Sequence, residues 1–210
     1  MSHPVSYTII KYWEGKFDMS LKNRYSALKE KVRSRKEDFA SLMRFVETQT
    51  AYLSAPASTR FHLCREQGLL EHSVNVAETL LLLRETLMPA LSEESCVIVA
   101  LLHDLGKAGV PGQPQYIENL PSEKQQRYGY SANTPFRFNT QLTYLSVPVR
   151  SLYLILPYLP LTQEEAQAIA YHDGQYVQEN KGVATRECPL TLLLQYADNW
   201  SGFIMEEKKL

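Results

Sequence analysis

One apolar segment restricts the fold of this chain more than any other feature. Residues 96–102, Cys-Val-Ile-Val-Ala-Leu-Leu, are apolar without interruption, and the preceding Ser92-Glu-Glu is typical of a helix N-terminus. A helix that is apolar on all sides belongs in the middle of a domain. Since His103 and Asp104 follow directly, this helix is predicted to carry two polar side chains into the interior.

Helical spacing of apolar residues recurs along most of the chain. Between residues 21 and 50, one long or two short amphipathic helices are expected, because apolar residues recur there at helical intervals. Further helices are expected at about residues 69–87, 149–158, 163–172 and 190–203. There is no convincing strand alternation, so the sequence predicts an all-α bundle.

A length of 210 residues fits one main domain. We expect residues 1–54 to form an N-terminal helical extension packed on the core, and residues 55–210 to form the domain that carries the functional site. Within that domain, residues 109–148 hold five prolines and four tyrosines without clear periodicity. We interpret this segment as a long irregular loop that is ordered as a lid, because disordered segments are poor in aromatic residues.

Composition argues against several classes of protein. The 22 basic and 23 acidic residues nearly cancel, so no overall field favours non-specific binding to nucleic acid or to a membrane surface. The three cysteines show no C-x-x-C spacing, which argues against a disulfide framework and against a cysteine zinc site. No export signal or membrane span is expected, and a cytoplasmic setting is the default.

Two more polar residues lie on apolar helix faces. His72 precedes Val76 by four residues and Leu80 by eight, so its imidazole should project from the buried face. Asp198 follows Leu194 by four residues, and an isolated ionised carboxylate on such a face would be very costly. Taken singly, each residue is also explained as a hydrogen-bonded core residue.

A metal ion is the economical common partner for the interior polar groups on three predicted helices. These groups are His72, His103, Asp104 and Asp198. Imidazole nitrogen together with carboxylate oxygen suits manganese, iron, cobalt, nickel or zinc, whereas the absence of sulfur ligands disfavours a structural zinc site. Open coordination positions would then hold water and substrate.

Local sequence adds a family resemblance. Residues 101–107, Leu-Leu-His-Asp-Leu-Gly-Lys, resemble the motif of the HD phosphohydrolase superfamily. Ala55-Pro-Ala-Ser58, His62 and residues 68–73, Gly-Leu-Leu-Glu-His-Ser, are similar to the segment before the first ligand histidine in two related groups. These groups are the bacterial HD-type 3′-to-5′ exoribonucleases and the HD domains of conjugative relaxases.

The resemblance implies a helical bundle around a divalent metal held by the first His, the HD doublet and the last Asp. In this sequence those residues are His72, His103, Asp104 and Asp198. Asp104 would be catalytic, and in some members the equivalent Asp bridges a second metal held by histidines that lie between the doublet and the last Asp. Here only His172 lies in that region. The resemblance leaves open whether one or two ions bind, and whether they are Mn, Ni, Co, Fe, Zn or Mg.

Three residues near the motif carry further interpretations. His172 could bind the second metal, contact the phosphate or act as the acid that protonates the leaving oxygen; the alternative is a surface histidine at a helix end. His62 matches a histidine of the exoribonuclease segment and could bind the second metal or the phosphate, or serve a structural role. Lys107 is expected to hold the doublet loop or the substrate phosphate, with a solvated lysine as the alternative.

Together these features indicate a metal-dependent phosphohydrolase that cleaves a phosphate ester with metal-activated water. The expected partner is a small phosphorylated substrate, with a nucleotide as first choice, because the lid offers rings that could stack on a base. The expected substrate contacts are Tyr116, Tyr128, Tyr130 and Arg137. Two alternatives stay open: a 3′-to-5′ exonuclease or phosphodiesterase acting on single-stranded nucleic acid, and a non-catalytic, metal-containing nucleotide-binding module.

Overall fold

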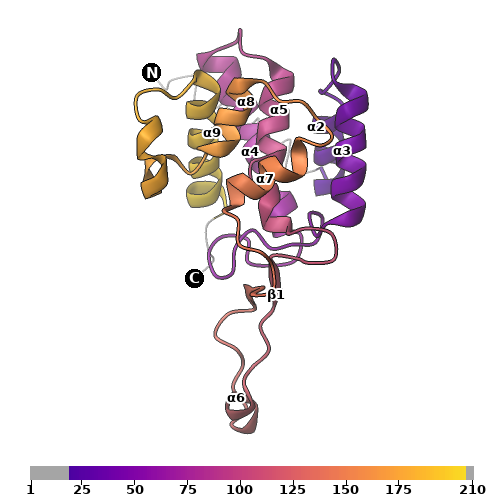
Figure 1. Ribbon diagram of the computed structural model, residues 1–210, viewed down its shortest axis with the longest axis vertical. Coiled ribbons are helices and arrows are strands. Elements are labelled where there is room, and N and C mark those ends of the chain that lie inside the picture. The colour runs from indigo at the N-terminus through magenta and orange to yellow at the C-terminus, as the bar shows by residue number, and fades with distance from the viewer. Residues whose placement is uncertain (1–18, 207–210) are drawn as a thin grey trace, which may run out of the picture.

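The helices α4 (Gly68–Leu87) and α5 (Glu93–Leu102) form the centre of a helical bundle (Figure 1). The structure is a computed structural model that describes residues 19–206. Every residue from Cys96 to Leu102 is buried, which confirms the prediction of an interior helix. The Ser92 side chain caps α5 by accepting a hydrogen bond from a first-turn amide at 3.2 Å.

Three further helices complete the bundle: α7 (Val147–Ile155), α8 (Gln163–Ala170) and α9 (Pro189–Trp200). α9 packs against α4 and α8, and α7 packs against the 3-10 turn η1 (Leu105–Ala108) that follows α5. α7 begins two residues earlier than expected, because Pro148 is tolerated in a first turn. No helix between residues 19 and 206 combines the length and the hydrophobicity that a bilayer crossing requires.

Residues 21–50 form two short helices rather than one long helix, α2 (Leu21–Lys29) and α3 (Lys36–Gln49). Their buried apolar side chains belong to the same hydrophobic core as α4 and α5. Arg35, between the two helices, makes a paired contact with the fully buried Glu165 carboxylate at 2.5 and 2.8 Å. A domain boundary at residue 54 stays a prediction, and residues 1–18 of the expected extension lie outside the described residues.

The proline-rich segment forms a ribbon that projects from one end of the bundle (Figure 1). Strand β1 (Tyr116–Glu118) pairs antiparallel with β2 (Phe136–Phe138), and the short helix α6 (Glu123–Arg127) lies at the far end. The all-α prediction is confirmed, and the two short strands of the ribbon are an addition that the sequence did not predict. Strands of three residues are too short to show alternation in a sequence, and their pairing brings together residues about twenty positions apart.

Candidate metal centre

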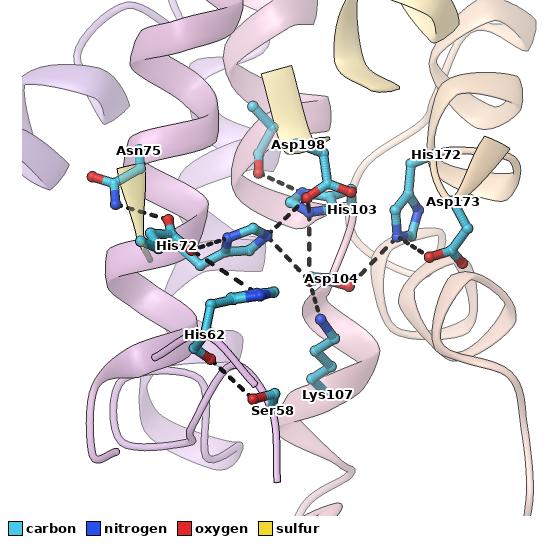
Figure 2. Close-up of polar contacts among 12 residues, drawn as sticks. Ser58, His62, His72, Asn75, His103, Asp104, Lys107, His172, Asp173 and Asp198 are labelled. Carbon is cyan, nitrogen blue, oxygen red and sulfur yellow. Dashed lines mark hydrogen bonds and ion pairs between the residues drawn. The ribbon is translucent and has the colours of Figure 1, made fainter. Parts of the chain in front are cut away.

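Side chains from α4, α9 and the end of α5 converge at one point inside the bundle (Figure 2). The His72 Nε2 atom lies 3.1 Å from Asp198 Oδ1 and 3.5 Å from Asp104 Oδ2. The His103 Nε2 atom lies 3.5 Å from the same Asp104 oxygen and 4.0 Å from Asp198 Oδ1. The structure therefore brings together all four residues that the sequence assigned to a metal.

The Nε2 atom of His103 faces the point where the four side chains converge, and its lone pair accepts no hydrogen bond. Its Nδ1 atom lies 2.8 Å from the Ala100 carbonyl oxygen, which can only accept, so Nδ1 carries the proton. The opposite nitrogen, Nε2, is buried and has no hydrogen-bond partner among the described residues. Burial lowers the pKa of His103 to about 4, so the ring stays neutral. A buried acceptor without a donor fits a cation at this position.

His72 is oriented from behind by Glu206, a residue that the sequence analysis did not assign. His72 Nδ1 lies 2.9 Å from Glu206 Oε2, and the other Glu206 oxygen accepts a hydrogen bond from the Asn75 amide at 2.8 Å. Burial lowers the pKa of His72, but the Glu206 and Asp198 carboxylates outweigh it and raise the pKa to about 10. A carboxylate behind a ligand histidine is the usual arrangement in metal sites, where it fixes which nitrogen faces the ion.

The two aspartates at the centre are held in their ionised form. Burial raises the pKa of Asp104, but the ammonium group of Lys107, 2.5 Å from Oδ2, and the nearby His103 and His172 together outweigh it and hold that pKa well below its usual range. Burial also raises the pKa of Asp198, but the hydrogen bond from His72 and the nearby His103 and His172 together outweigh it and lower that pKa. Ionised carboxylates beside a neutral imidazole form the donor set that first-row divalent metals prefer.

The second oxygen of Asp104 faces a third histidine. His172 Nε2 lies 3.5 Å from Asp104 Oδ1, and its Nδ1 donates to the Ile169 carbonyl at 2.8 Å. Burial lowers the pKa of His172, but Asp104 and Asp173 outweigh it and raise the pKa to about 9. His103, Asp104 and His172 thus form a second group whose ligand atoms lie within 4.8 Å of one another.

His62 lies at the edge of the centre, in the loop before α4. Its ring is 5.0 Å from the His72 ring, and its Nε2 atom is 3.9 Å from Glu206 Oε2. Burial lowers the pKa of His62, which leaves the ring neutral. The Ser58 hydroxyl holds this loop by donating to the His62 carbonyl at 2.9 Å (Figure 2).

Helix α7 fixes the loop that carries the doublet. The Ser151 hydroxyl accepts a hydrogen bond from the Gly106 amide and donates one to the His103 carbonyl, both at 2.8 Å. A Cβ atom on Gly106 would lie 2.3 Å from the Val147 carbonyl oxygen, so only glycine permits this close approach. The sequence analysis did not assign Ser151, and no local pattern marks a serine that bonds to a turn 45 residues away.

Two cavities that share lining residues lie at the centre. The smaller cavity, of about 240 Å³, is lined by His62, His72, Asp104, His172 and Asp198, and the larger is a groove of about 990 Å³. Both are lined by His62, Lys107, Gly202 and Phe203. Of the expected substrate contacts, Tyr116 and Arg137 line the groove. Tyr128 and Tyr130 do not line it and lie beside α6, 64% and 66% exposed.

Comparison with known proteins gives one match. The family model of the HD domain matches residues 69–201, which is more than half of the chain. The matched range contains the four converging ligands and His172, whereas His62 and Glu206 lie outside it. No match was found among curated proteins or among solved structures.

Proposed function

Because the chain belongs to the HD-domain family, we propose that it is a metal-dependent phosphohydrolase that cleaves a phosphate ester of a nucleotide. The observation that carries the proposal is the convergence of two imidazoles and two ionised carboxylates around the unpartnered His103 Nε2. Most buried polar atoms of a structural core have a hydrogen-bond partner, so a buried imidazole nitrogen that faces two carboxylates without a donor between them favours a bound cation.

One set of residues in the site would bind the cation, and their positions are fixed by the helices of the bundle. His72, His103, Asp104 and Asp198 would hold the cation, with a further ion near Asp104 Oδ1 and His172 if two are bound. A divalent cation at such a site supplies an activated water and polarises a phosphoryl oxygen. Four ligands from three segments of the bundle keep this donor set rigid without help from the substrate.

Lys107 and His172 would act on the phosphate itself. Lys107 lies on the wall of both cavities. Burial lowers the pKa of its ammonium group, but Asp104 and other nearby groups together raise it, so the group is charged at neutral pH and can pair with a phosphate oxygen. His172 Nε2 lines the same cavity, 3.5 Å from Asp104 Oδ1, so a proton on this nitrogen would be placed for transfer to a leaving oxygen. Serving as an acid and serving as a second metal ligand exclude each other for this nitrogen.

The aromatic lining of the groove beside the metal centre supports a nucleotide as the substrate. Tyr116 lines the groove together with Lys107, so a base stacked on this ring would leave its phosphate near the ammonium group. Arg137 lines the same groove and offers a second cation for the phosphate. Tyr128 and Tyr130 lie too far along the ribbon for this role, beside α6.

Turnover of a substrate panel tests the proposal. Protein loaded with Mn²⁺ or Ni²⁺ is incubated with nucleoside mono-, di- and triphosphates, an aryl phosphate and short single strands, and released phosphate and mononucleotides are quantified. We expect product from the wild-type protein and none from Asp198→Asn. Binding of a nucleotide without any product would instead identify the non-catalytic binding module.

A further inference from the structure

Helix α7 contacts two parts of the site through two adjacent side chains. Ser151 bonds to the loop that carries the doublet, and Arg150 bonds both to that loop and to the ribbon. We propose that Arg150 is a positioning residue that fixes the ribbon on the doublet loop and thereby places Tyr116 in the wall of the groove. This inference rests on the proposed hydrolysis of a nucleotide and identifies a residue that would set the preference for that substrate.

The guanidinium group of Arg150 joins three segments that are distant in the sequence. Its Nη1 atom donates to the Gly106 carbonyl at 3.2 Å and to the side-chain oxygen of Gln115. Its Nη2 atom donates to the Thr143 carbonyl at 3.0 Å. Gln115 directly precedes β1, and Thr143 lies between β2 and α7. One side chain therefore connects both ends of the ribbon to the loop that follows Asp104.

The charge of Arg150 has no counter-ion. The residue is 3% exposed, forms no ion pair with a carboxylate within residues 19–206, and has no hydrogen-bond partner for its Nε atom there. A buried charge of this kind is costly, and an apolar side chain of similar size is often at least as stable. A planar guanidinium group, however, offers several N–H donors in a fixed arrangement and can bond to three carbonyl oxygens at once. Bridging of the three segments, rather than stability, explains an arginine at this position.

Gln115 connects Arg150 to the groove. Its side chain, in a residue that is 7% exposed, accepts a hydrogen bond from Arg150 and forms another with the Tyr116 hydroxyl. Burial raises the pKa of Tyr116, and Lys107 and Gln115 offset only part of this rise, so the hydroxyl keeps its proton at neutral pH. Tyr116 and Lys107 both line the groove. Arg150 thus holds the ring on which a base would stack beside the ammonium group that would pair with the phosphate.

The ribbon needs an anchor because its own strands are short. β1 and β2 have three residues each, and Asn139 closes their base by donating to the Gln115 carbonyl at 2.8 Å and to the Pro114 carbonyl at 3.0 Å. These bonds tie the two halves of the ribbon to each other and not to the bundle. A two-stranded ribbon is at best marginally stable by itself in water. Loss of Arg150 should therefore loosen the ribbon, while Ser151 still holds the doublet loop.

Hydrogen exchange measured by mass spectrometry tests this contact without turnover. Arg150→Met removes the three bonds and leaves an apolar side chain in the buried position, so the bundle should stay folded. The backbone amides of residues 115–118 and 136–139 should exchange about tenfold faster or more, as expected for the loss of several hydrogen bonds. Amides of α4 and α5 should exchange as in the wild-type protein. The matched control is Arg44→Met, which replaces an exposed arginine on α3.

Kinetics with two substrates separate Arg150 from Ser151. The substrates are a nucleotide and an alkyl phosphate, which has no ring to stack, and the preference is the ratio of their kcat/KM values. Arg150→Met should raise the KM of the nucleotide and lower the preference by up to about 5- to 150-fold, the range for one stacked ring. Ser151→Ala should instead lower kcat for both substrates and leave the preference as it is.

Two further variants show how Arg150 acts. Arg150→Lys keeps the charge but cannot bond to three carbonyl groups in the same way, so its preference should fall as in Arg150→Met. In a Tyr116→Ala background, Arg150→Met should change the preference by less than about twofold, because its effect depends on that ring. Full rescue by Arg150→Lys would assign the effect to charge and overturn the positioning role.

The outcomes separate this inference from the proposed function. Unchanged exchange of the ribbon amides in Arg150→Met, or an equal loss of turnover with both substrates, would overturn the inference. If the wild-type protein hydrolyses neither substrate, the proposed function fails, and calorimetric binding of the nucleotide takes the place of the kinetics. Faster exchange in the ribbon with weaker nucleotide binding and wild-type affinity for Mn²⁺ would then still support the positioning role, and unchanged nucleotide binding would contradict it.

Discussion

The imidazole of His72 is held between two carboxylates, with its Nδ1 atom 2.9 Å from Glu206 Oε2 and its Nε2 atom 3.1 Å from Asp198 Oδ1. The first contact orients the ring, and the second places Nε2 among the other ligand atoms. Glu206 is itself buried and receives a second hydrogen bond from Asn75, so its position does not depend on the metal. The ligand geometry is therefore built into the fold.

Replacing Glu206 should weaken metal binding. Glu206→Ala removes the acceptor behind His72, and loss of such a partner lowers metal affinity about 10- to 100-fold. Glu206→Gln keeps an oxygen that accepts from Nδ1, so a smaller loss is expected. Isothermal titration with Zn²⁺ or Mn²⁺ measures both, with the exposed Glu37→Ala as control. Wild-type affinity in Glu206→Ala would show that the contact is not needed for orientation.

Replacing His172 should separate its role as a second metal ligand from its role at the phosphate. One oxygen of Asp104 faces His172 and the other faces His72 and His103, which is the arrangement expected of a bridging carboxylate. A fall from two bound equivalents to one in His172→Ala, as measured by elemental analysis, would make His172 a ligand of a second ion. An unchanged stoichiometry with slower turnover would instead make His172 a phosphate contact or the acid.

Replacing Asp104 should abolish hydrolysis without unfolding the protein. Asp104 belongs to both groups of ligand atoms, so Asp104→Ala removes a ligand from each possible ion. Phosphate release should fall to background, while circular dichroism should still report a helical protein. Asp38→Ala, which changes an exposed aspartate on α3, should retain full activity. Substantial turnover by Asp104→Ala would exclude the doublet from the chemistry.

The bond between Arg35 and Glu165 should make stability depend on pH. Burial raises the pKa of Glu165, but its hydrogen bonds from Arg35 and from the Thr162 amide, with smaller contributions nearby, together outweigh it and lower the pKa below the ordinary value of 4.5. A carboxyl group whose pKa is lower in the folded state stabilises the fold above that ordinary value, and the stabilisation is lost as the pH falls through the folded pKa. Only the Glu165 side of the pair is fully buried, so removing Arg35 would leave an uncompensated buried carboxylate, which is destabilising.

Arg35→Ala is therefore expected to lower the free energy of unfolding strongly at pH 7, and by less as the pH falls below about 4.5. Urea denaturation at several pH values measures this difference. The half-exposed pair of Lys31 and Glu93 provides the control, since Lys31→Ala should cost less than about 1 kcal/mol at pH 7. A loss of equal size in both variants would contradict the account.

The sequence predicted the parts of the site that follow from helical periodicity. His72 and Asp198 recur with the apolar residues of their own helices, and the uninterrupted apolar segment placed His103 inside the protein. The ends of the helices also followed local rules, as the cap at Ser92 and the capping box at Thr162 show.

The parts that the sequence did not predict depend on contacts between distant segments. Glu206 follows Asp198 by eight residues, but a π-helical turn over Ser201–Met205 carries the chain past the point where the helix was expected to end. The structure of the ribbon depends on the pairing of two strands that are too short to be recognised in the sequence. The sequence therefore did not show which of its tyrosines lie near the metal centre. The bonds from Ser151 to the doublet loop exist only after α7 has packed.

The central claim is that a divalent cation is held by His72, His103, Asp104 and Asp198. A metal titration followed by thermal unfolding tests this claim most directly. Chelator-stripped protein is supplied with Mn²⁺ or Ni²⁺, and protein purified without chelator is subjected to elemental analysis. At a hundredfold excess over the dissociation constant, a bound ion stabilises the fold by about 2.7 kcal/mol, which should raise the melting temperature by roughly 5–10 °C. Asp198→Asn should lose most of this rise. Wild-type protein that contains no metal and melts at the same temperature with and without added ions would contradict the account.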